Sequence, residues 1–361
     1  MRAETPIHNA LLEALRTVAP GTALRRGIDD IIRARLGALI AIGEPSKLAF
    51  LFSGGMRINL PFSPQHLYEL AKMDGAIIVN RELSRLVYAN VQLLPDANIP
   101  SSETGTRHRT AERVARQTNA MMVSISQQRE TVTLFHGEAR YQLARISDLL
   151  GRTNQAMATL DSYRQRLDQG LTRLTALEFQ SAVTLDDVIV VLQRAEMTHR
   201  MADEVERDCI ELGQEARLIR MQLDDLAEGV QRERAAVIYD YIADGRKGKG
   251  AAAVEALGNL SSSESVDPER YVELLRYEAG TDPLDLSVEP RGYRMLSHVP
   301  RVPEGVVRRL VRDLGSFDAI VRASHRDLEQ VEGVGAVRAR EIREGLRRLQ
   351  EHNLVDRYLE L

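Results

Sequence analysis

The hydrophobic pattern divides this chain of 361 residues into a mixed first part and a helical remainder. Up to about residue 143, short apolar runs of strand length alternate with segments whose apolar residues recur every three or four positions. The helical segments cover residues 5–18, about 22–35, 65–73 and 107–119, and the strand-like runs cover 36–42, 48–52, 76–79, 86–91, 121–125 and 131–135. This alternation predicts one α/β domain around a mostly buried, mixed central sheet.

A helical spacer is predicted after Leu143, because no strand-like run follows and no proline occurs between Pro100 and Pro268. From Ile146 to Leu174 the apolar residues repeat at three- and four-residue steps, as one long amphipathic helix requires. Further helices are expected over 185–200, 202–226 and 230–243. Helices of this kind are usually packing elements, so we predict an all-α bundle without a ligand site of its own.

The last module, from about Ser287, contains a glycine-rich turn between two helical patterns. It resembles a helix-hairpin-helix motif, whose turn aims backbone N–H groups at a DNA phosphate while nearby cations track the backbone. A weaker copy at 298–303 lacks the Gly-x-Gly turn, which leaves its phosphate contact open. The alternative is a pair of packed helices without a ligand. The residues expected to contact DNA are Gly333, Val334, Gly335, Arg338, Arg340 and Arg343.

Charge and cysteine content narrow the possible classes of protein. Residues 291–350 hold 13 arginines and 8 acidic residues, a net charge of +5 that leaves −9 for the rest of the chain. A basic module on an acidic body favours nucleic acid as its partner. The single cysteine, Cys209, excludes a disulfide framework and a cysteine-rich zinc cluster. No apolar run is long enough to span a membrane and no signal peptide is evident, so we expect a cytoplasmic protein.

Two short stretches of the first domain carry candidate chemistry. In 103–113, Thr106 or Thr110 can cap a helix whose start favours an anion, with Arg107 and Arg109 adding donors. In the second stretch, Asp74-Gly75 joins a helix to a buried strand, where a carboxylate can hold Mg²⁺. Each stretch alone is more often a solvated surface or an ordinary turn.

Together the stretches 67–76, 88–96 and 103–113 closely resemble the diadenylate cyclase domain. The whole chain, with its spacer and basic end, is similar to diadenylate cyclases that carry a DNA-binding module. The resemblance implies a cyclase domain at 1–145, a helical linker at 146–286 and a helix-hairpin-helix domain at 287–361. It also implies condensation of two ATP molecules into cyclic di-AMP and two pyrophosphates, with Mg²⁺ or Mn²⁺ as cofactor.

The resemblance also assigns roles to particular residues. Asp74 would hold the metal and assist deprotonation of the attacking hydroxyl. The residues expected to bind ATP are Gly75 and Leu93 at the adenine, through their backbone, Thr106, Arg107, His108, Arg109 and Thr110 at the triphosphate, and Ser126 at a further phosphate, together with Ala76. Arg107, His108 and Arg109 would also be catalytic. One domain supplies one ATP site, so two copies must face each other. The resemblance implies that they do so in a homo-octamer and that branched DNA lowers synthesis.

The chain departs from the family pattern in two places. Met56 replaces an expected aromatic residue, and few cations follow Ser126, which puts a phosphate role for Gln127 and Gln128 in doubt. The competing hypothesis is a DNA-binding scaffold that binds ATP without turnover.

Overall fold

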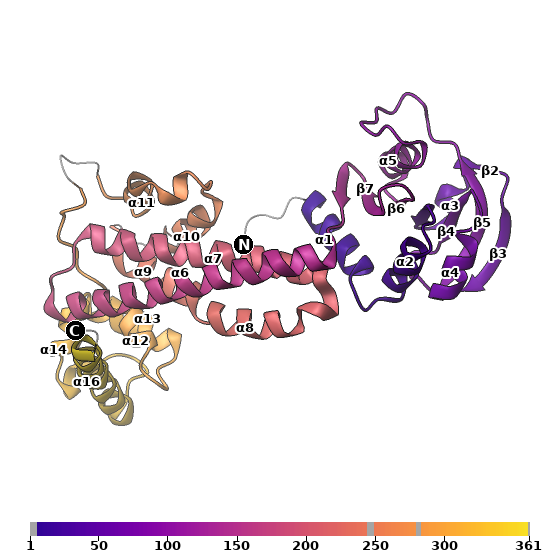
Figure 1. Cartoon of the computed structure of the whole chain (residues 1–361). Coiled ribbons are helices and arrows are strands. Elements are labelled where there is room, and N and C mark those ends of the chain that lie inside the picture. The colour runs from indigo at the N-terminus through magenta and orange to yellow at the C-terminus, as the bar shows by residue number, and fades with distance from the viewer. Residues whose placement is uncertain (1–5, 244–248, 279–282, 360–361) are drawn as a thin grey trace. The chain divides into compact units, whose positions relative to one another are not determined.

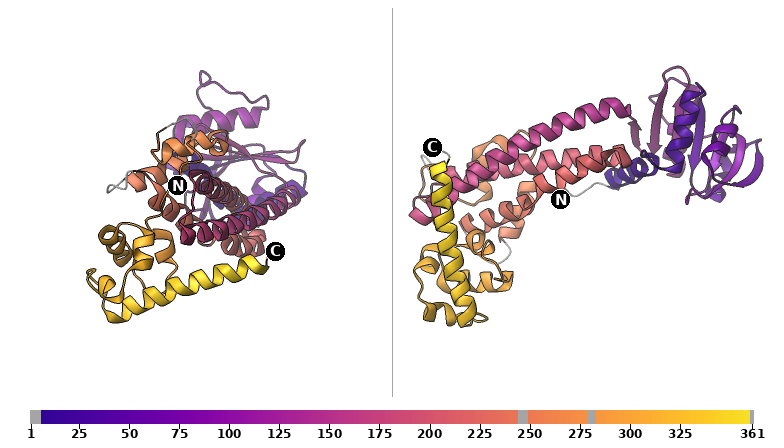
Figure 2. Two further views of the ribbon diagram at one scale, coloured as in Figure 1. Left: turned by 90° about the vertical axis from the view of Figure 1, so that its left-hand side faces the viewer. Right: turned by 60° about the horizontal axis from the view of Figure 1, so that its bottom comes forward.

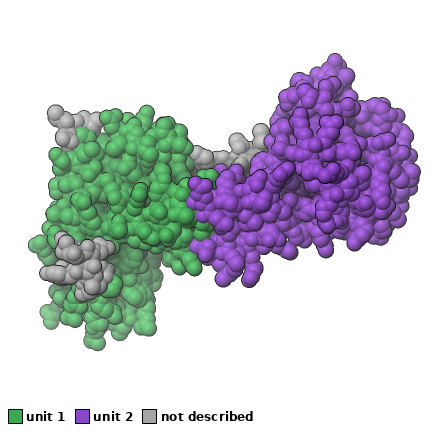
Figure 3. Space-filling view, in the orientation of Figure 1, with its two compact units in different colours: residues 1–2, 156–204, 223–361 green, residues 3–155, 205–222 purple. Residues whose placement is uncertain are grey.

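The computed structural model describes residues 6–243, 249–278 and 283–359. The chain forms two compact units (Figure 3). The first, here called the sheet unit, comprises residues 3–155 and 205–222; the second, the helical unit, comprises 156–204 and 223–361.

A single mixed sheet organises the sheet unit (Figure 1). The strand order is β2-β5-β4-β1-β6-β7-β8, and β3 also pairs with β5. Among the described strands, β1 and β4 pair in parallel and all other neighbours are antiparallel. The strands are β1 (Ala38–Ile42), β2 (Phe52–Ser53), β3 (Met56–Pro61), β4 (Ala76–Val79), β5 (Arg85–Leu93), β6 (Met121–Ser126), β7 (Thr131–His136) and β8 (Ala139–Gln142).

Helices cover both faces of this sheet, which explains why β1 and β4 are apolar at every position. Along β1, Ile40 packs with the helices of one face, whereas Leu39 and Ala41 pack with the other. One face carries α1 (Pro6–Val18), α2 (Ala23–Arg33) and α4 (Pro64–Leu70); the other carries α5 (Thr106–Thr118) and the short α3 (Pro45–Leu48). The predicted α/β domain with a mixed sheet is confirmed.

The predicted strand at 48–52 is wrong. This run completes α3 and continues as a 3-10 turn over Ala49–Leu51 before the short β2 begins. The apolar side chains that it buries, Leu48 and Leu51, are three residues apart, which is a helical spacing, and Phe50 between them is exposed. Two strands, β3 and β8, were not predicted, because their residues are largely exposed and present no apolar run.

The predicted helical region is confirmed, with one boundary corrected. The long helix α6 (Ile146–Gln180) lies side by side with α7 (Leu185–Leu212), and Arg194 Nη1 donates to the Arg166 carbonyl at 2.7 Å (Figure 2). The expected break near residue 201 is absent, since α7 continues to Leu212 and ends at Gly213, whose φ is 55°. The following helices are α8 (Arg217–Ala227), α9 (Val230–Tyr241), α10 (Lys249–Asn259) and α11 (Pro268–Leu274).

The last helices pack around an apolar core of their own within the helical unit. Leu296, Leu310 and Phe317 are among its buried side chains. None of the described helices is long and apolar enough to cross a membrane. The helices of this core are α12 (Tyr293–Ser297), α13 (Glu304–Leu314), α14 (Phe317–Arg322), α15 (His325–Glu329) and α16 (Ala336–Leu359).

Candidate nucleotide site and candidate DNA-contacting turn

Strand register brings most of the predicted ATP-binding residues to one end of the sheet. Because β1 and β4 are parallel, the residues before them, Gly37 and Gly75, lie at the same end. The antiparallel partner β5 ends there at Leu93, since Ala76 pairs with Val91. The antiparallel partner β6 ends there at Ser126, since Ala38 pairs with Ile125. We call this edge the site end.

Helix α5 points its first turn at the site end. The guanidinium of Arg107 fills the space beside Gly37, where a Cβ would lie 2.3 Å from Nη1. The N-cap of the helix is Gly105 and makes no side-chain cap, so the predicted capping by Thr106 or Thr110 is wrong: the helix begins at Thr106 itself. The first N–H groups of α5 therefore have no side-chain acceptor from the cap, which favours an anion there.

The segment before α5 is fixed by the second and third turns of the helix. Glu112 is buried and accepts hydrogen bonds from the Ser101 hydroxyl and, at 3.1 Å, from the Ser102 N–H. Arg113 Nε donates to the Ile99 carbonyl at 2.8 Å. This support was not predicted, although an acidic residue two turns into an otherwise basic helix was a visible signal. It holds the chain that leads into the candidate phosphate site.

Arg109 lies on the exposed side of the same turn and reaches back to the preceding loop. Its Nε and Nη2 donate to the carbonyls of Glu103 and Thr104, each at 3.3 Å. These bonds are long, and the side chain remains exposed. Arg109 is therefore tethered beside the site end but accessible to solvent, as is Thr106.

The Asp74-Gly75 junction shows why a glycine is needed. A Cβ at Gly75 would lie 2.3 Å from the backbone carbon of Asn90, so any side chain would displace β5. The Gly75 N–H donates to Asn90 Oδ1 at 3.2 Å. Asp74 is exposed, and among the described residues its carboxylate makes no hydrogen bond or ion pair. Ala76 is buried, so only its backbone can face a ligand.

The pKa of His108 is sensitive to the arginines near α5. Its ring is half-buried, with the centroid 6.4 Å from that of Phe135. Burial lowers the pKa of His108; Glu103 opposes this, and the cations Arg140, Arg129 and Arg107 lower it further. Arg129 and Arg140 were not predicted as site residues. Arg129 follows Ser126 in the β6–β7 turn, where its N–H donates to the Ser126 hydroxyl at 3.3 Å.

The site end can hold a divalent cation only if the bound nucleotide and waters supply most of the metal's ligands. Among the described residues, no group of three or more His, Cys, Asp or Glu side chains could hold a metal. Asp74 offers one exposed carboxylate at the mouth of the sheet. Mg²⁺ commonly binds through one or two carboxylates together with substrate phosphates and waters, so this donor set fits.

The predicted DNA-contacting residues lie in the helical unit, around the turn between α15 and α16. Gly333 has a φ of 86°, a backbone conformation that favours glycine. Arg309 Nε and Arg338 Nη1 donate to the consecutive carbonyls of Glu332 and Gly333, at 2.7 and 2.6 Å. Arg338 therefore braces the turn, a role that was not predicted. Arg340 is exposed and makes no hydrogen bond or ion pair within the described chain.

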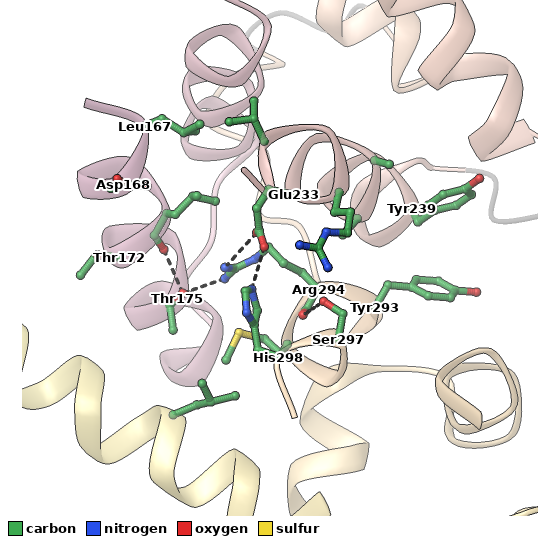
Figure 4. A pocket seen from close by; sticks show the side chains of 18 of the residues that line it. Leu167, Asp168, Thr172, Thr175, Glu233, Tyr239, Tyr293, Arg294, Ser297 and His298 are labelled. Atoms are coloured by element: carbon green, nitrogen blue, oxygen red, sulfur yellow. Dashed lines mark hydrogen bonds and ion pairs between the residues drawn. The ribbon is translucent and has the colours of Figure 1, made fainter. Parts of the chain in front are cut away.

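Two cavities lined by described residues lie away from both the predicted ATP-binding and the predicted DNA-contacting residues. One, of about 420 Å³, opens at the opposite end of the sheet beside Ile42 and Met121. The other, of about 800 Å³, lies in the helical unit between α6, α9, α12, α13 and α16. In the second cavity His298 Nε2 lies 2.8 Å from Glu233 Oε1, and Arg294 meets Thr175 (Figure 4). Neither cavity is lined by a predicted ATP-binding residue.

Comparison with known proteins assigns two stretches within the first 284 residues to family models, which do not cover the turn around Gly333. Residues 25–140 match the model described as DisA bacterial checkpoint controller nucleotide-binding, and residues 143–284 match the DisA bacterial checkpoint controller linker region. The DNA integrity scanning protein DisA of Carboxydothermus hydrogenoformans is 48% identical over 338 residues, covering 94% of this chain and 96% of that protein. This chain belongs to the DisA family. The DisA protein of Acetivibrio thermocellus is 45% identical over 346 residues, covering 96% of both chains.

A solved structure shows weaker similarity. DacA from Staphylococcus aureus is 20% identical, with a TM-score of 0.26, covering 38% of this chain and 85% of that one. This similarity is too low to define the fold. The family match itself assigns a nucleotide-binding domain of the diadenylate cyclase type to the sheet unit, which contains the site end.

Proposed function

We propose that this DisA-family protein is a diadenylate cyclase that condenses two ATP molecules into cyclic di-AMP and two pyrophosphates. The observation that carries the proposal is that a carboxylate, Asp74, and a cation, Arg107, lie together at the site end, and neither has a partner among the described residues. They are accompanied by Ser126 and the start of α5. Phosphoryl transfer needs chiefly positioning and charge neutralisation, which this set of groups supplies.

In each half-reaction the 3′-oxygen of one ATP forms a bond to the α-phosphorus of the other, and the bond from that phosphorus to the bridging oxygen breaks. The hydroxyl loses its proton, and pyrophosphate leaves with the bonding electrons. Arg107, Arg109 and the N–H groups of α5 hold the triphosphate, while backbone at Gly75, Ala76 and Leu93 receives adenine. His108, Thr106, Thr110 and Ser126 complete the phosphate contacts.

Asp74 has two parts in this scheme: it holds Mg²⁺ or Mn²⁺ and assists removal of the hydroxyl proton. When bound, the metal neutralises charge on the leaving pyrophosphate. One site binds one ATP, so two copies must face each other, and we propose the homo-octamer of the family as the assembly that achieves this.

The second part of the proposal is that the turn around Gly333 binds branched DNA and that this binding lowers synthesis. The support is the left-handed glycine turn, the exposed Arg340 and the net charge of +5 over residues 291–350. Backbone N–H groups and cations of this kind bind DNA phosphates without reading the sequence.

The test is chromatography of reactions containing purified protein, ATP and Mg²⁺, with and without a four-way DNA junction. We expect cyclic di-AMP from the wild type, less of it with the junction, and at least about 100-fold less from Asp74→Asn. Glu82→Gln, which changes a carboxylate in the turn at the opposite end of β4, is the control and should retain activity. ATP binding without product would support the scaffold hypothesis in place of the enzyme.

A further inference from the structure

The C-terminal helices contain a structural repeat with an offset of 32 residues. Helix α12 begins at Tyr293 and α15 at His325; α13 begins at Glu304 and α16 at Ala336. In the first hairpin, residues 293–314, the second helix starts 11 residues after the first. The same spacing holds in the second hairpin, which starts at residue 325. The sequence reveals only a weak copy, because the two turns share few residues.

Hydrogen bonds and buried side chains repeat with the same offset. The Val299 N–H donates to the Leu296 carbonyl at 3.1 Å, and its equivalent, Val331, donates to Leu328 at 3.2 Å. The first turn of each following helix also matches, with Val307 bonded to Pro303 and Ala339 to Gly335. The equivalent pairs Leu296 and Leu328, Val299 and Val331, and Leu310 and Ile342 are all buried in one core.

The two turns share an unusual backbone conformation but not the residue that favours it. In the second hairpin the left-handed position is Gly333, with φ 86°; in the first it is Arg301, with φ 65°. A non-glycine residue is strained in this conformation, and such strain commonly marks a functional position. No local packing requirement for arginine is evident, because the Arg301 side chain is 83% exposed.

The first turn has also lost a donor that the second retains. Gly335 of the second hairpin corresponds to Pro303, which has no N–H group. The Arg301 guanidinium supplies donors and positive charge at the same turn. Its one contact within the described residues is to Glu341, at 3.5 Å and at the surface, so it remains available to a ligand.

We propose that Arg301 is a second DNA-phosphate ligand, in which a side-chain cation on the first hairpin replaces the backbone donors used by the second. The inference rests on the proposed DNA binding of the second hairpin and adds a separate contact to it. Two hairpins related by an internal repeat would then hold the DNA backbone at two points, one through glycine N–H groups and the other through a strained arginine.

The decisive variant is Arg301→Gly in the full-length protein, because strain and binding predict opposite effects. Removing the strain should raise the urea midpoint of unfolding. Losing a phosphate contact should weaken binding of a fluorescent four-way junction several-fold at about 0.1 M salt. It should also reduce the slope of log K against log salt by about 0.9. Arg301→Lys should keep most of that slope, because it keeps the charge.

The matched control is Arg276→Gly. Arg276 is another exposed arginine in the left-handed region, with φ 64°, and it lies outside both hairpins. This variant removes the same charge and the same kind of strain, so it should raise the urea midpoint and leave the DNA affinity and salt slope unchanged. Equal losses of DNA affinity in both variants would overturn the proposal, because net charge alone would then explain them.

A further variant, Arg340→Ala, separates failure of this inference from failure of the proposed function. If it weakens junction binding while Arg301→Gly binds with the affinity and slope of the wild type, only the second contact is wrong. If the wild-type protein fails to bind the junction at all, the proposed DNA binding itself is wrong. A urea midpoint of Arg301→Gly at or below that of the wild type would overturn the strain argument.

Discussion

Among the described residues, charged side chains lie unpaired at the site end of the sheet but are paired where α6, α9 and α12 meet. We call this second region, which contains Glu178, Asp240, Tyr241 and Arg294, the joint. At the site end, Asp74 and Arg107 have no partner among the described residues. At the joint, Arg294 and Glu178 form an ion pair with side chains 3% and 0% exposed, and the Tyr241 hydroxyl donates to the same carboxylate at 2.7 Å. Breaking a paired buried charge destabilises the fold, whereas the exposed Asp74 and the half-buried Arg107 can be replaced without that cost and are accessible to a ligand. Substitutions in the two regions should therefore affect different properties.

The largest effect is expected for Arg107→Ala. Loss of a cation aimed at the transferring phosphate should lower cyclic di-AMP synthesis by about 10³-fold. The unfolding midpoint should change little, because the guanidinium makes no ion pair with any other described residue. Synthesis is measured by chromatography, and Arg81→Ala, an exposed arginine beyond the far end of β4, is the control. Parallel loss of activity, DNA binding and stability would show that Arg107 is structural.

Glu178→Gln should have the reverse effect. It removes the carboxylate that pairs most closely with the buried Arg294, whose other acidic partner, Glu233, lies 4.0 Å away. Breaking a buried ion pair typically costs about 3–5 kcal/mol of unfolding free energy. Urea unfolding of the full chain measures the loss. Glu273→Gln, which breaks an exposed pair with Arg270, should change the midpoint far less. If the two variants are equally stable, the joint does not hold the helical unit together.

A pH dependence should also arise at the joint. Burial and the nearby carboxylate of Glu178 raise the pKa of Asp240 to about 7, although it accepts hydrogen bonds from the N–H groups of Gly292, Tyr293 and Arg294. The folded state then binds more protons than the unfolded state between about pH 4 and 7. The unfolding free energy should fall as pH rises through this window, by up to about 1.4 kcal/mol per pH unit.

Urea unfolding at pH 5, 6, 7 and 8 measures this slope, and Asp240→Asn should flatten it. A slope that is the same in the wild type and the variant would assign the pH dependence to other groups.

The smallest effect is the pH dependence of stability that arises from His108, and its sign is opposite to that from Asp240. Its pKa is lowered by burial and by nearby cations, so the unfolded state binds more protons just below pH 6.5. Stability should therefore fall slightly as pH drops through that range. In NMR titration of the ring, assigned with His108→Gln, the pKa should lie below 6.5 without nucleotide and rise when ATP phosphates bind. A pKa that ATP does not change would place His108 outside the phosphate site.

Prediction from sequence succeeded where local pattern decides structure. The strand Ala76–Val79 was predicted at its observed bounds, and α5 differs from the predicted helix by one residue at each end. It failed at Leu48–Phe52, where apolar residues fit a helical turn as well as a strand. The strands β3 and β8 were not predicted, because most of their residues are exposed and they lack a clear alternation of apolar and polar residues.

By itself, the sequence determined most element types, apart from Leu48–Phe52, β3 and β8, together with the site motifs and the basic charge of the C-terminal module, since these depend on residue type and spacing along the chain. Only the tertiary structure decided that Gly75 is required by the close approach of Asn90 and that Arg107 reaches Gly37 at the site end. It alone showed that Arg301, in the first hairpin, has the same left-handed backbone conformation as Gly333 at the equivalent place of the second hairpin. These facts depend on strand register and on contacts between distant segments, and no local pattern of residues encodes them.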